Sequence, residues 1–361
     1  DSFSQYFVTK IQKVRSTLSH IRQFEISNTT SSRLDTLVPT SHTEVTSVIT
    51  KVPAKSCELD PVPTSLLKRC LPFVVPAAVN IINASFNLGI VPAALKVAAV
   101  RPTLKKPNSD INCLQNYRPI SNLPFLSKVT ERIAFSRLLD YLLEHDVLDD
   151  HQSAYRPNYS VETLLANLSS DILKEMDKGN VTAVALLDMS AAFDTVHHPI
   201  FTKRLQSHGV TGSALEWFKS YLRNRVQYVS VGDLKSKSAP LACGVPQGSV
   251  GGPLLFSIYL QPLGNIIKSH NLQYHCYADD TQLYVSFPPS PTGIACAKER
   301  LENCIDDIKI WMDLNGLKLN EGKTEFIVFG SKNSLSKINS QSLNLRVGNN
   351  NMQSVAKVRN L

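Results

Sequence analysis

Hydrophobic residues recur at helical spacing in several parts of the chain. Residues 1–24 place their aromatic and aliphatic side chains on one face, which predicts an amphipathic helix. The same spacing predicts further helices over residues 64–70, 76–88, 128–144, 160–178, 212–223 and 299–314. Residues 27–50 are instead rich in serine and threonine, which indicates a linker with one short helix.

Shorter apolar runs predict strands. Val181–Asp188 is almost continuously apolar, which is typical of a strand buried on both faces. Two runs, residues 273–276 and 281–286, flank Tyr277-Ala-Asp-Asp280 and predict a hairpin with the acidic pair at its tip. Further strands are expected over residues 98–104, 226–231 and 326–329. Because helices and strands alternate irregularly and hairpins come late, the pattern favours an α+β fold over a doubly wound sheet.

Composition narrows the class of protein without naming it. The 361 residues are 43% hydrophobic and 19% charged, as in an ordinary globular protein. Lysine and arginine outnumber the acids by 38 to 30, and the resulting charge of +8 is compatible with a polyanionic partner or with a solvated basic surface. The seven cysteines are odd in number and contain no C-x2-C pair, which argues against a disulfide framework and against a zinc site.

Two long runs lack charge, residues 71–95 and 238–267. Their length alone would suit a membrane span. Both runs are broken by prolines, however, so we expect buried segments of a core and no membrane association.

Three acidic side chains form the main candidate for chemistry. Asp188 ends the apolar strand, and Asp279 and Asp280 lie at the hairpin tip. If the strand and the hairpin lie side by side, the three carboxylates meet and repel one another, which favours binding of Mg²⁺ or Mn²⁺. Two such ions would support phosphoryl transfer. A lone aspartate is more often a turn or cap residue, but the combination of strand end and hairpin tip argues against that interpretation.

Two other segments add candidate contacts. Phe193 follows Asp188 by five residues and would suit the floor of a sugar pocket, with core packing as the alternative. Asp194, beside it, is interpreted as a helix-start or turn residue, with metal binding as the alternative. The loop Gly244-Val-Pro-Gln-Gly-Ser249 lets backbone amides approach a phosphate closely, and Gln247 would bond a nucleotide or template strand.

Basic residues near these segments are candidates for phosphate contacts. Lys105 lies in an acid-free basic stretch, and Arg118 and Arg156 lie in turn-like segments. All three would suit triphosphate oxygens or a nucleic-acid backbone, although a solvated surface explains each of them equally well. Lys323 is a candidate to protonate the leaving pyrophosphate.

Six blocks occur in a fixed order along the chain. They are Asn116-Tyr-Arg-Pro-Ile-Ser121, Gln152-Ser-Ala-Tyr-Arg156, Leu187-Asp-Met-Ser-Ala-Ala-Phe-Asp-Thr195, Gly244-Val-Pro-Gln-Gly-Ser249, Tyr277-Ala-Asp-Asp280, and Asn315-Gly-Leu-Lys-Leu-Asn320 with Lys323-Thr-Glu325. Together they resemble the reverse transcriptase of non-LTR (LINE-type) retrotransposons, of the jockey-like or chicken-repeat-like lineage.

The resemblance implies a right-hand polymerase fold. It implies fingers and palm over residues 90–330, with an antiparallel palm sheet packed on helices. Residues 1–89 would be an N-terminal helical and linker segment that precedes the polymerase. Residues 331–361 would be the truncated start of a thumb or connection, with the thumb largely missing.

The resemblance also implies roles for single residues. Asp188 and Asp279 would be metal ligands for two Mg²⁺ or Mn²⁺ ions, with Asp280 completing the acidic cluster. Phe193 would be the gate against ribose 2′-hydroxyls. Gln247 and Gly248 would contact the nucleotide, and Lys105, Arg118 and Arg156 would lie in the fingers.

The partners implied are an RNA template, a DNA primer or target site, and dNTPs. The reaction would be RNA-directed DNA synthesis inside the cell, in the nucleus when it acts on a chromosomal target, although no clear import signal is present. A two-metal nuclease would use the same ions but would need neither the Phe193 gate nor the Gln247 loop. The sequence indicates no oligomeric state.

Three positions depart from the family pattern. His197 stands where a second aspartate is expected, Gly251 replaces a leucine, and Tyr159-Ser-Val161 replaces His-Ser-Thr. The three carboxylates are intact, so chemistry is not excluded. The extra glycine beside the nucleotide loop is expected to loosen that loop and impair positioning. These departures leave a catalytically silent, nucleic-acid-binding remnant of the same fold as the alternative.

Overall fold

The chain forms two compact units, each built from segments that are distant in sequence. The computed structural model describes residues 1–18, 32–54, 57–156, 158–338 and 344–357. Unit 1 contains the described residues of Asp1–Thr17, Gln23–Val147 and Phe193–Ile258. Unit 2 contains those of Leu18–Arg22, Leu148–Ala192 and Tyr259–Leu361. The segments expected from the family, 1–89, 90–330 and 331–361, are divisions along the sequence, and their boundaries stay predictions.

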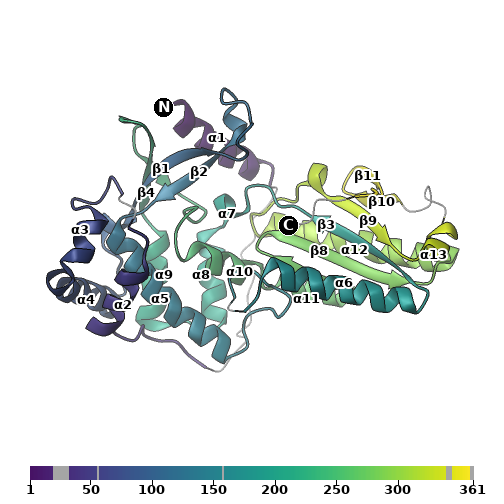
Figure 1. Ribbon diagram of the computed structural model, residues 1–361, viewed down its shortest axis with the longest axis horizontal. Helices are drawn as coiled ribbons and strands as arrows, with labels where there is room; N and C mark the ends of the chain where they lie inside the picture. The colour runs from purple at the N-terminus through teal and green to yellow at the C-terminus, as the bar shows by residue number, and fades with distance from the viewer. Residues whose placement is uncertain (19–31, 55–56, 157, 339–343, 358–361) are drawn as a thin grey trace. The chain divides into compact units, whose positions relative to one another are not determined.

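Unit 1 is built around a mixed sheet of strand order β2-β1-β4-β5. Strand β1 pairs antiparallel with β2 and parallel with β4, and β6 also pairs with β4. Helix α1 (Ser2–Ser16) lies beside this sheet (Figure 1) and packs Phe7 against Val100 and Val229. The strands are β1 (Val97–Leu104), β2 (Tyr117–Asn122), β4 (Arg225–Val231), β5 (Leu234–Lys235) and β6 (Ala239–Leu241).

Helices surround an aromatic core in unit 1. Trp217 is fully buried and its ring meets those of Phe86, Phe135 and Tyr221. The helices of this unit are α2 (His42–Lys51), α3 (Thr64–Arg69), α4 (Leu71–Leu88), η1 (Ala93–Lys96), η2 (Leu114–Asn116), α5 (Phe125–Glu144), α8 (His198–Ser207) and α9 (Gly212–Leu222). Two boundaries between the units fall within helices, the short α7 (Ala192–Thr195) and the apolar α10 (Gly252–Leu260).

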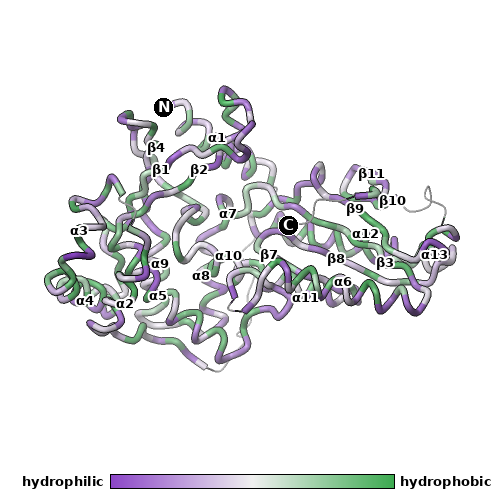
Figure 2. Tube along the Cα trace, viewed as in Figure 1, coloured by the Kyte–Doolittle hydropathy of each residue, from purple (hydrophilic) through white to green (hydrophobic). Residues whose placement is uncertain are grey.

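Helix α4 carries the first of the two charge-free runs, and Figure 2 shows its hydrophobic character. Among the described residues, it is the one helix long and apolar enough to cross a membrane by length and composition. Its buried face packs on α2 and α9, and the indole of Trp217 donates a hydrogen bond to Ser85 Oγ at 2.9 Å. One face of α4 is thus packed in a core, but only 33% of its span is buried and Phe73 and Leu88 are exposed, so the buried segment expected from the sequence is found only in part.

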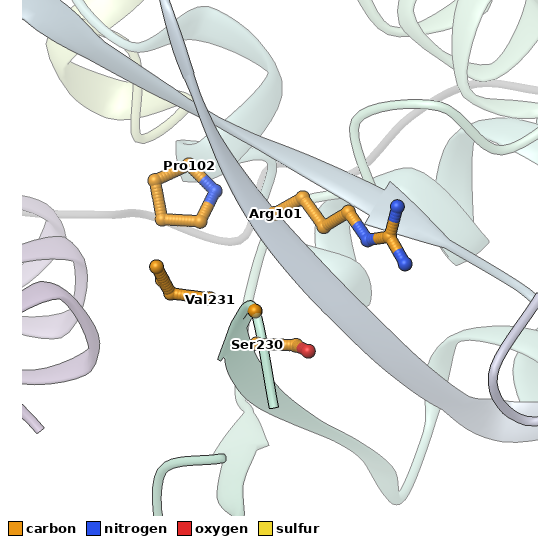
Figure 3. A pocket seen from close by; sticks show the side chains of 5 residues that line it. Arg101, Pro102, Ser230 and Val231 are labelled. Atoms are coloured by element: carbon orange, nitrogen blue, oxygen red, sulfur yellow. The ribbon is translucent and has the colours of Figure 1, made fainter. Parts of the chain in front are cut away.

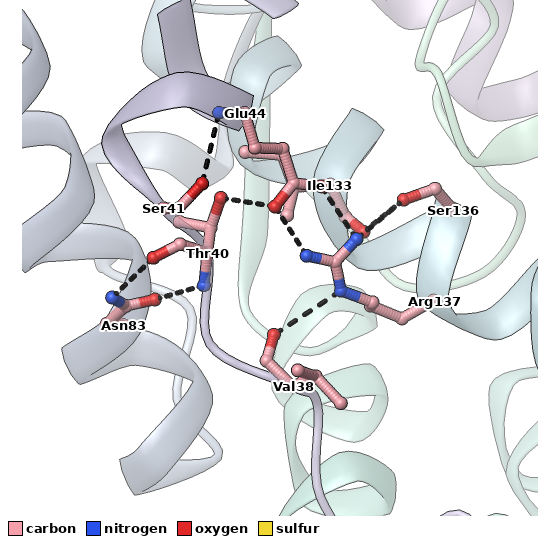
Figure 4. Close-up of polar contacts among 8 residues, drawn as sticks. All are labelled: Val38, Thr40, Ser41, Glu44, Asn83, Ile133, Ser136 and Arg137. Atoms are coloured by element: carbon pink, nitrogen blue, oxygen red, sulfur yellow. Dashed lines mark hydrogen bonds and ion pairs between the residues drawn. The ribbon is translucent and has the colours of Figure 1, made fainter.

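Polar contacts fix the segment that precedes α4 (Figure 4). The Arg137 guanidinium on α5 holds both carboxylate oxygens of Glu44 on α2, at 2.7 and 2.5 Å. This hydrogen bonding lowers the pKa of Glu44, and burial opposes the effect. The Asn83 side chain on α4 bonds both backbone groups of Thr40, at 2.7 and 3.0 Å. Residues 32–51 are thus anchored to α4 and α5, and α2 is the short helix expected in the linker.

Unit 2 is built around an antiparallel sheet of strand order β7-β8-β3-β9. Leu168 and Ile172 of α6 pack on Val184, Tyr284 and Ile327 of three strands, and Figure 1 shows α6 along this sheet. The main elements are α6 (Val161–Asp177), β3 (Val181–Leu187), α11 (Leu263–Ser269), β7 (Gln273–Tyr277), β8 (Asp280–Phe287), α12 (Pro291–Leu314), η3 (Glu321–Lys323) and β9 (Glu325–Phe329). After β9 come α13 (Lys332–Ser336), β10 (Asn344–Val347) and β11 (Asn350–Gln353).

The structure confirms the α+β class and the central strand, since β3 is the inner strand between β8 and β9 and is buried along most of its length. Several bounds differ from those expected. Helix α4 begins earlier, at Leu71, and contains Pro76. Helix α12 also begins earlier, at Pro291. Residues 19–24 of the first expected helix lie outside the described residues. The seven cysteines are free thiols, as the spacing indicated.

Candidate active site

The three aspartates lie at one end of the sheet of unit 2. Leu187 of β3 pairs with Thr281 of β8 in antiparallel register. Extending that register by one residue places Asp188 opposite Asp280. Asp279 occupies the two-residue turn between β7 and β8, next to Asp280. The strand end and the hairpin tip therefore lie side by side, which is the condition under which the three carboxylates can meet.

Electrostatics show that these carboxyl groups interact. The pKa of Asp280 is raised to about 6, first by burial and then by the carboxylates of Asp279 and Asp188. The ammonium of Lys323 opposes this shift. A carboxyl group whose pKa is raised by neighbouring carboxylates is typical of a site that binds cations or protons.

Asp188 is held by Asn320, a residue of the last sequence block for which no role was predicted. The Asn320 side chain donates a hydrogen bond to Asp188 Oδ2 at 2.6 Å, and Asn320 N donates to the backbone oxygen of Asp188 at 2.8 Å. Lys323 Nζ lies 3.6 Å from the same carboxylate oxygen, and its side chain is 71% exposed. Asn320 is the last residue of the Asn315–Asn320 block. Its place in that block is the sequence feature that could have indicated a role at the site.

The donor set suits a hard divalent cation, because it consists of carboxylate oxygens whose charges repel. Among the described residues, no group of three or more histidine, cysteine, aspartate or glutamate side chains is already gathered as a metal site. The chemistry of the three aspartates thus fits Mg²⁺ or Mn²⁺, while chelation requires their side chains to turn toward one another.

The Gln247 loop is fixed within unit 1. Its backbone is tied to the segment after Asp188, with Val245 N donating to Phe193 O at 2.9 Å. Ser121 N donates to Gln247 O at 2.6 Å. Gly248 has a φ of +108°, and a Cβ there would lie 2.8 Å from Ser121 O. Gly248 is therefore required by backbone conformation and by close approach.

Asp194 proves to be the side-chain partner of this loop. Gln247 Nε2 donates to Asp194 Oδ1 at 2.7 Å. Asp194 is buried, which raises its pKa, and the charge of Lys10 and the hydrogen bond from Gln247 oppose the rise. Asp194 lies in α7 as expected, but its carboxylate is a long-range hydrogen-bond acceptor, and no local pattern indicated that contact.

Gly251 leaves no gap in the packing, because an aromatic ring fills the space beside it, and the expected loosening of the loop stays a prediction. A Cβ at this position would lie 2.5 Å from Phe135 Cδ2 and closer still to two other atoms of that ring. The Phe135 ring occupies the space that a side chain at position 251 would need. The neighbouring Val250 N donates to the buried carboxylate of Glu131 at 2.8 Å, which fixes the loop from α5.

Phe193 is half-buried in unit 1. Its ring stacks on that of Phe256, with centroids 4.6 Å apart. The stack fixes one face of the ring, so the position of Phe193 is set by packing. Such a fixed ring is compatible with both interpretations of the residue, the sugar-pocket wall and the core contact.

The basic candidates are divided between the two units. Lys105 and Arg118 are exposed at the same end of the β1–β2 pair in unit 1, and Lys105 Nζ donates to Gln115 O at 2.7 Å. Arg156 belongs to unit 2 and donates to Asp149 O at 2.8 Å. Its guanidinium also lies over the Tyr159 ring, 4.7 Å from the centroid. Arg156 is thus largely engaged within its own segment.

A pocket of about 320 Å³ lies on the sheet of unit 1 (Figure 3). Arg101 and Pro102 of β1 line one side, and Ser230 and Val231 of β4 line the other, followed by Gly232. The lining residues all belong to unit 1, so the pocket contains none of the three aspartates.

Comparison with known proteins identifies the family. The family profile described as Reverse transcriptase (RNA-dependent DNA polymerase) matches residues 104–354. The chain belongs to the reverse transcriptase family. The match implies a polymerase palm and fingers, and the family generally uses divalent metal ions.

The relatives are polymerases of mobile elements. The RNA-directed DNA polymerase from mobile element jockey of Drosophila melanogaster is 28% identical over 306 residues, which are 80% of this chain and 32% of that protein. The probable RNA-directed DNA polymerase from transposon BS of the same organism is 30% identical over 293 residues, 78% of this chain and 31% of that protein. The chain thus spans about a third of the length of these relatives. The family expected from the six sequence blocks is confirmed.

Proposed function

We propose that this chain is the fingers and palm of an RNA-directed DNA polymerase of a non-LTR retrotransposon. It would add dNTPs to the 3′-hydroxyl of a DNA primer or target site, copying an RNA template. The observation that supports this most directly is the register that places Asp188 opposite Asp280, with Asp279 beside it. In this proposal residues 331–361 begin the thumb or connection, and the enzyme works in the nucleus on chromosomal DNA.

Asp188, Asp279 and Asp280 would hold two Mg²⁺ or Mn²⁺ ions by turning their carboxylates toward one another. Bound divalent ions lower the pKa of a primer hydroxyl and neutralise charge on the reacting phosphate. Asn320 would keep Asp188 in place through its 2.6 Å hydrogen bond. Lys323, largely exposed beside Asp188, would donate a proton to the leaving pyrophosphate.

Residues of unit 1 would bind and select the nucleotide. The Phe193 ring would exclude a ribose 2′-hydroxyl, and its stack on Phe256 would keep it in position. Gln247 and Gly248 would contact the nucleotide and template. Lys105 and Arg118 are exposed and would neutralise phosphate charge. Arg156, which donates a hydrogen bond to Asp149 O, would likewise lie near the incoming nucleotide and template.

Primer extension on an RNA template with Mg²⁺ tests the proposal. The intact chain should extend the primer, and the Asp279→Ala, Asp280→Ala double variant should not. The matched control is Asp177→Ala, an exposed aspartate at the end of α6 in the same unit, which should extend normally. Salt-sensitive RNA binding without synthesis would instead indicate a silent remnant. Cleavage without synthesis would indicate a two-metal nuclease.

A further inference from the structure

The turn that carries Asp279 has an unfavourable backbone conformation. Ala278, the first of its two central residues, has a φ of +56°, and Asp279 has no positive φ. This pattern corresponds to a type II′ turn, in which glycine is the usual first residue. An alanine is disfavoured there by its Cβ, so the surrounding structure must hold the conformation.

The Gln152 side chain supplies that hold. Ala278 N donates to Gln152 Oε1 at 3.0 Å, and Gln152 Nε2 donates to Ala278 O at 3.2 Å. One amide thus satisfies both backbone groups of the disfavoured residue, as a neighbouring peptide unit would in a sheet. Both residues are buried, at 6% and 7% exposure, so water does not compete for these bonds.

Gln152 is itself rigidly placed in unit 2. Its backbone forms a parallel bridge with Cys276, through Cys276 N to His151 O at 2.8 Å and Ser153 N to Cys276 O at 2.9 Å. Ala154 N also donates to Gln152 Oε1, at 3.0 Å. The segment therefore lies along β7 as an added edge, and the amide reaches the turn from a fixed base.

We propose that Gln152 is a positioning residue for the catalytic turn and sets where Asp279 and Asp280 present their carboxylates. The inference rests on the proposed function only for the role of those carboxylates. Gln152 acts through the backbone of Ala278, the residue directly before Asp279.

Replacing Gln152→Met tests the role, because methionine is similar in size but forms none of the three side-chain hydrogen bonds. We expect kcat to fall by roughly tenfold to a hundredfold, as for a misplaced catalytic group. The Mg²⁺ concentration for half-maximal activity should rise, with the KM for primer-template unchanged. Hydrogen exchange at the Ala278 amide should accelerate by roughly tenfold. The matched control is Gln273→Met, an exposed glutamine of β7, which should change none of these quantities.

A second variant separates positioning from general stability. Glycine adopts positive φ without the Cβ penalty. In an Ala278→Gly background, the loss caused by Gln152→Met should therefore shrink severalfold. A merely structural Gln152 would lower the Tm of the variant without changing its Mg²⁺ requirement, and Ala278→Gly would not rescue it.

Two results would overturn the proposal. One is a Gln152→Met variant with the parent's kcat and Mg²⁺ requirement. The other is unchanged exchange at the Ala278 amide. If the intact chain fails to extend a primer, the proposed function fails, but amide exchange and the Mg²⁺-induced change in Tm still report whether Gln152 holds the turn.

Discussion

Restoring the family's leucine by Gly251→Leu should destabilise this chain. The new Cβ would overlap the Phe135 ring, with Cδ2 at 2.5 Å. That ring cannot move aside easily, because it is buried against Trp217, Phe218 and Tyr221 with centroids 5.4 to 6.3 Å away. The leucine must therefore force either the ring or the loop backbone out of place.

The magnitude follows from the packing. Overfilling a close-packed core costs about 1–3 kcal/mol. Since three aromatic rings confine Phe135, we expect the upper end, about 3 kcal/mol. At about 2–4 °C per kcal/mol for units of this size, Tm should fall by roughly 6–12 °C. Phe135→Ala alone should cost about 3–5 kcal/mol, because it opens a cavity.

Thermal unfolding of the two single variants and the double variant measures the coupling. In the double variant the leucine enters the space that Phe135 vacates, so its cost should be less than the sum of the single costs by about 2 kcal/mol. A Gly251→Leu variant as stable as the parent would refute the reasoning. So would two costs that simply add, since the side chains would then not share one space.

Three further predictions concern the site. Phe193→Ala should raise ribonucleotide incorporation relative to deoxynucleotide incorporation in primer extension, and unchanged discrimination would disprove the gate. The pKa of Asp280 in the folded protein is about 6, above its ordinary value of 3.8. In metal-free protein, the contribution of Asp280 to the free energy of unfolding is therefore fully present below about pH 4 and is lost as the pH rises through 6. Protons compete with Mg²⁺ for the Asp280 carboxylate. The rise in Tm that Mg²⁺ induces in the parent should therefore fade below pH 6. In the Asp280→Asn variant the same rise should be independent of pH between 5 and 7.5. Asp194→Ala should raise the KM for dNTP severalfold, Gln247→Ala should do the same, and the double variant should be no worse than Gln247→Ala.

The fold could be predicted wherever a pattern was local and strong. The continuous apolar run of β3 and the acidic hairpin of β7 and β8 had clear signals, and both elements are present. Strand β2 had no clear signal in the sequence, because Pro119 and its polar neighbours are typical of a turn. A proline is tolerated in this strand because β2 lies at the edge of the sheet. Helix α10 is apolar on all sides, so it has no helical periodicity to read.

The candidate site likewise contains local features, which could be predicted, and long-range contacts, which could not. The end of a buried strand and the tip of a hairpin are local features, so the position of the three aspartates could be predicted. Their polar supports could not, because each hydrogen bond joins distant parts of the chain. Gln152 lies 126 residues from Ala278, Asn320 lies 132 from Asp188, and Gln247 lies 53 from Asp194. No helical or strand period connects such pairs.

The departure at Gly251 shows how such distant contacts change the interpretation of a motif. Within the loop alone, a glycine in place of leucine indicates lost packing and supports the alternative of a silent remnant. In the structure, the Phe135 ring on α5 occupies the space that a leucine side chain would fill. The Glu131 carboxylate on the same helix accepts a hydrogen bond from Val250 N. The lack of a side chain at Gly251 is therefore no evidence of lost packing, and its effect on activity stays a prediction. Each departure from the family pattern therefore has to be judged together with the side chain that packs against it.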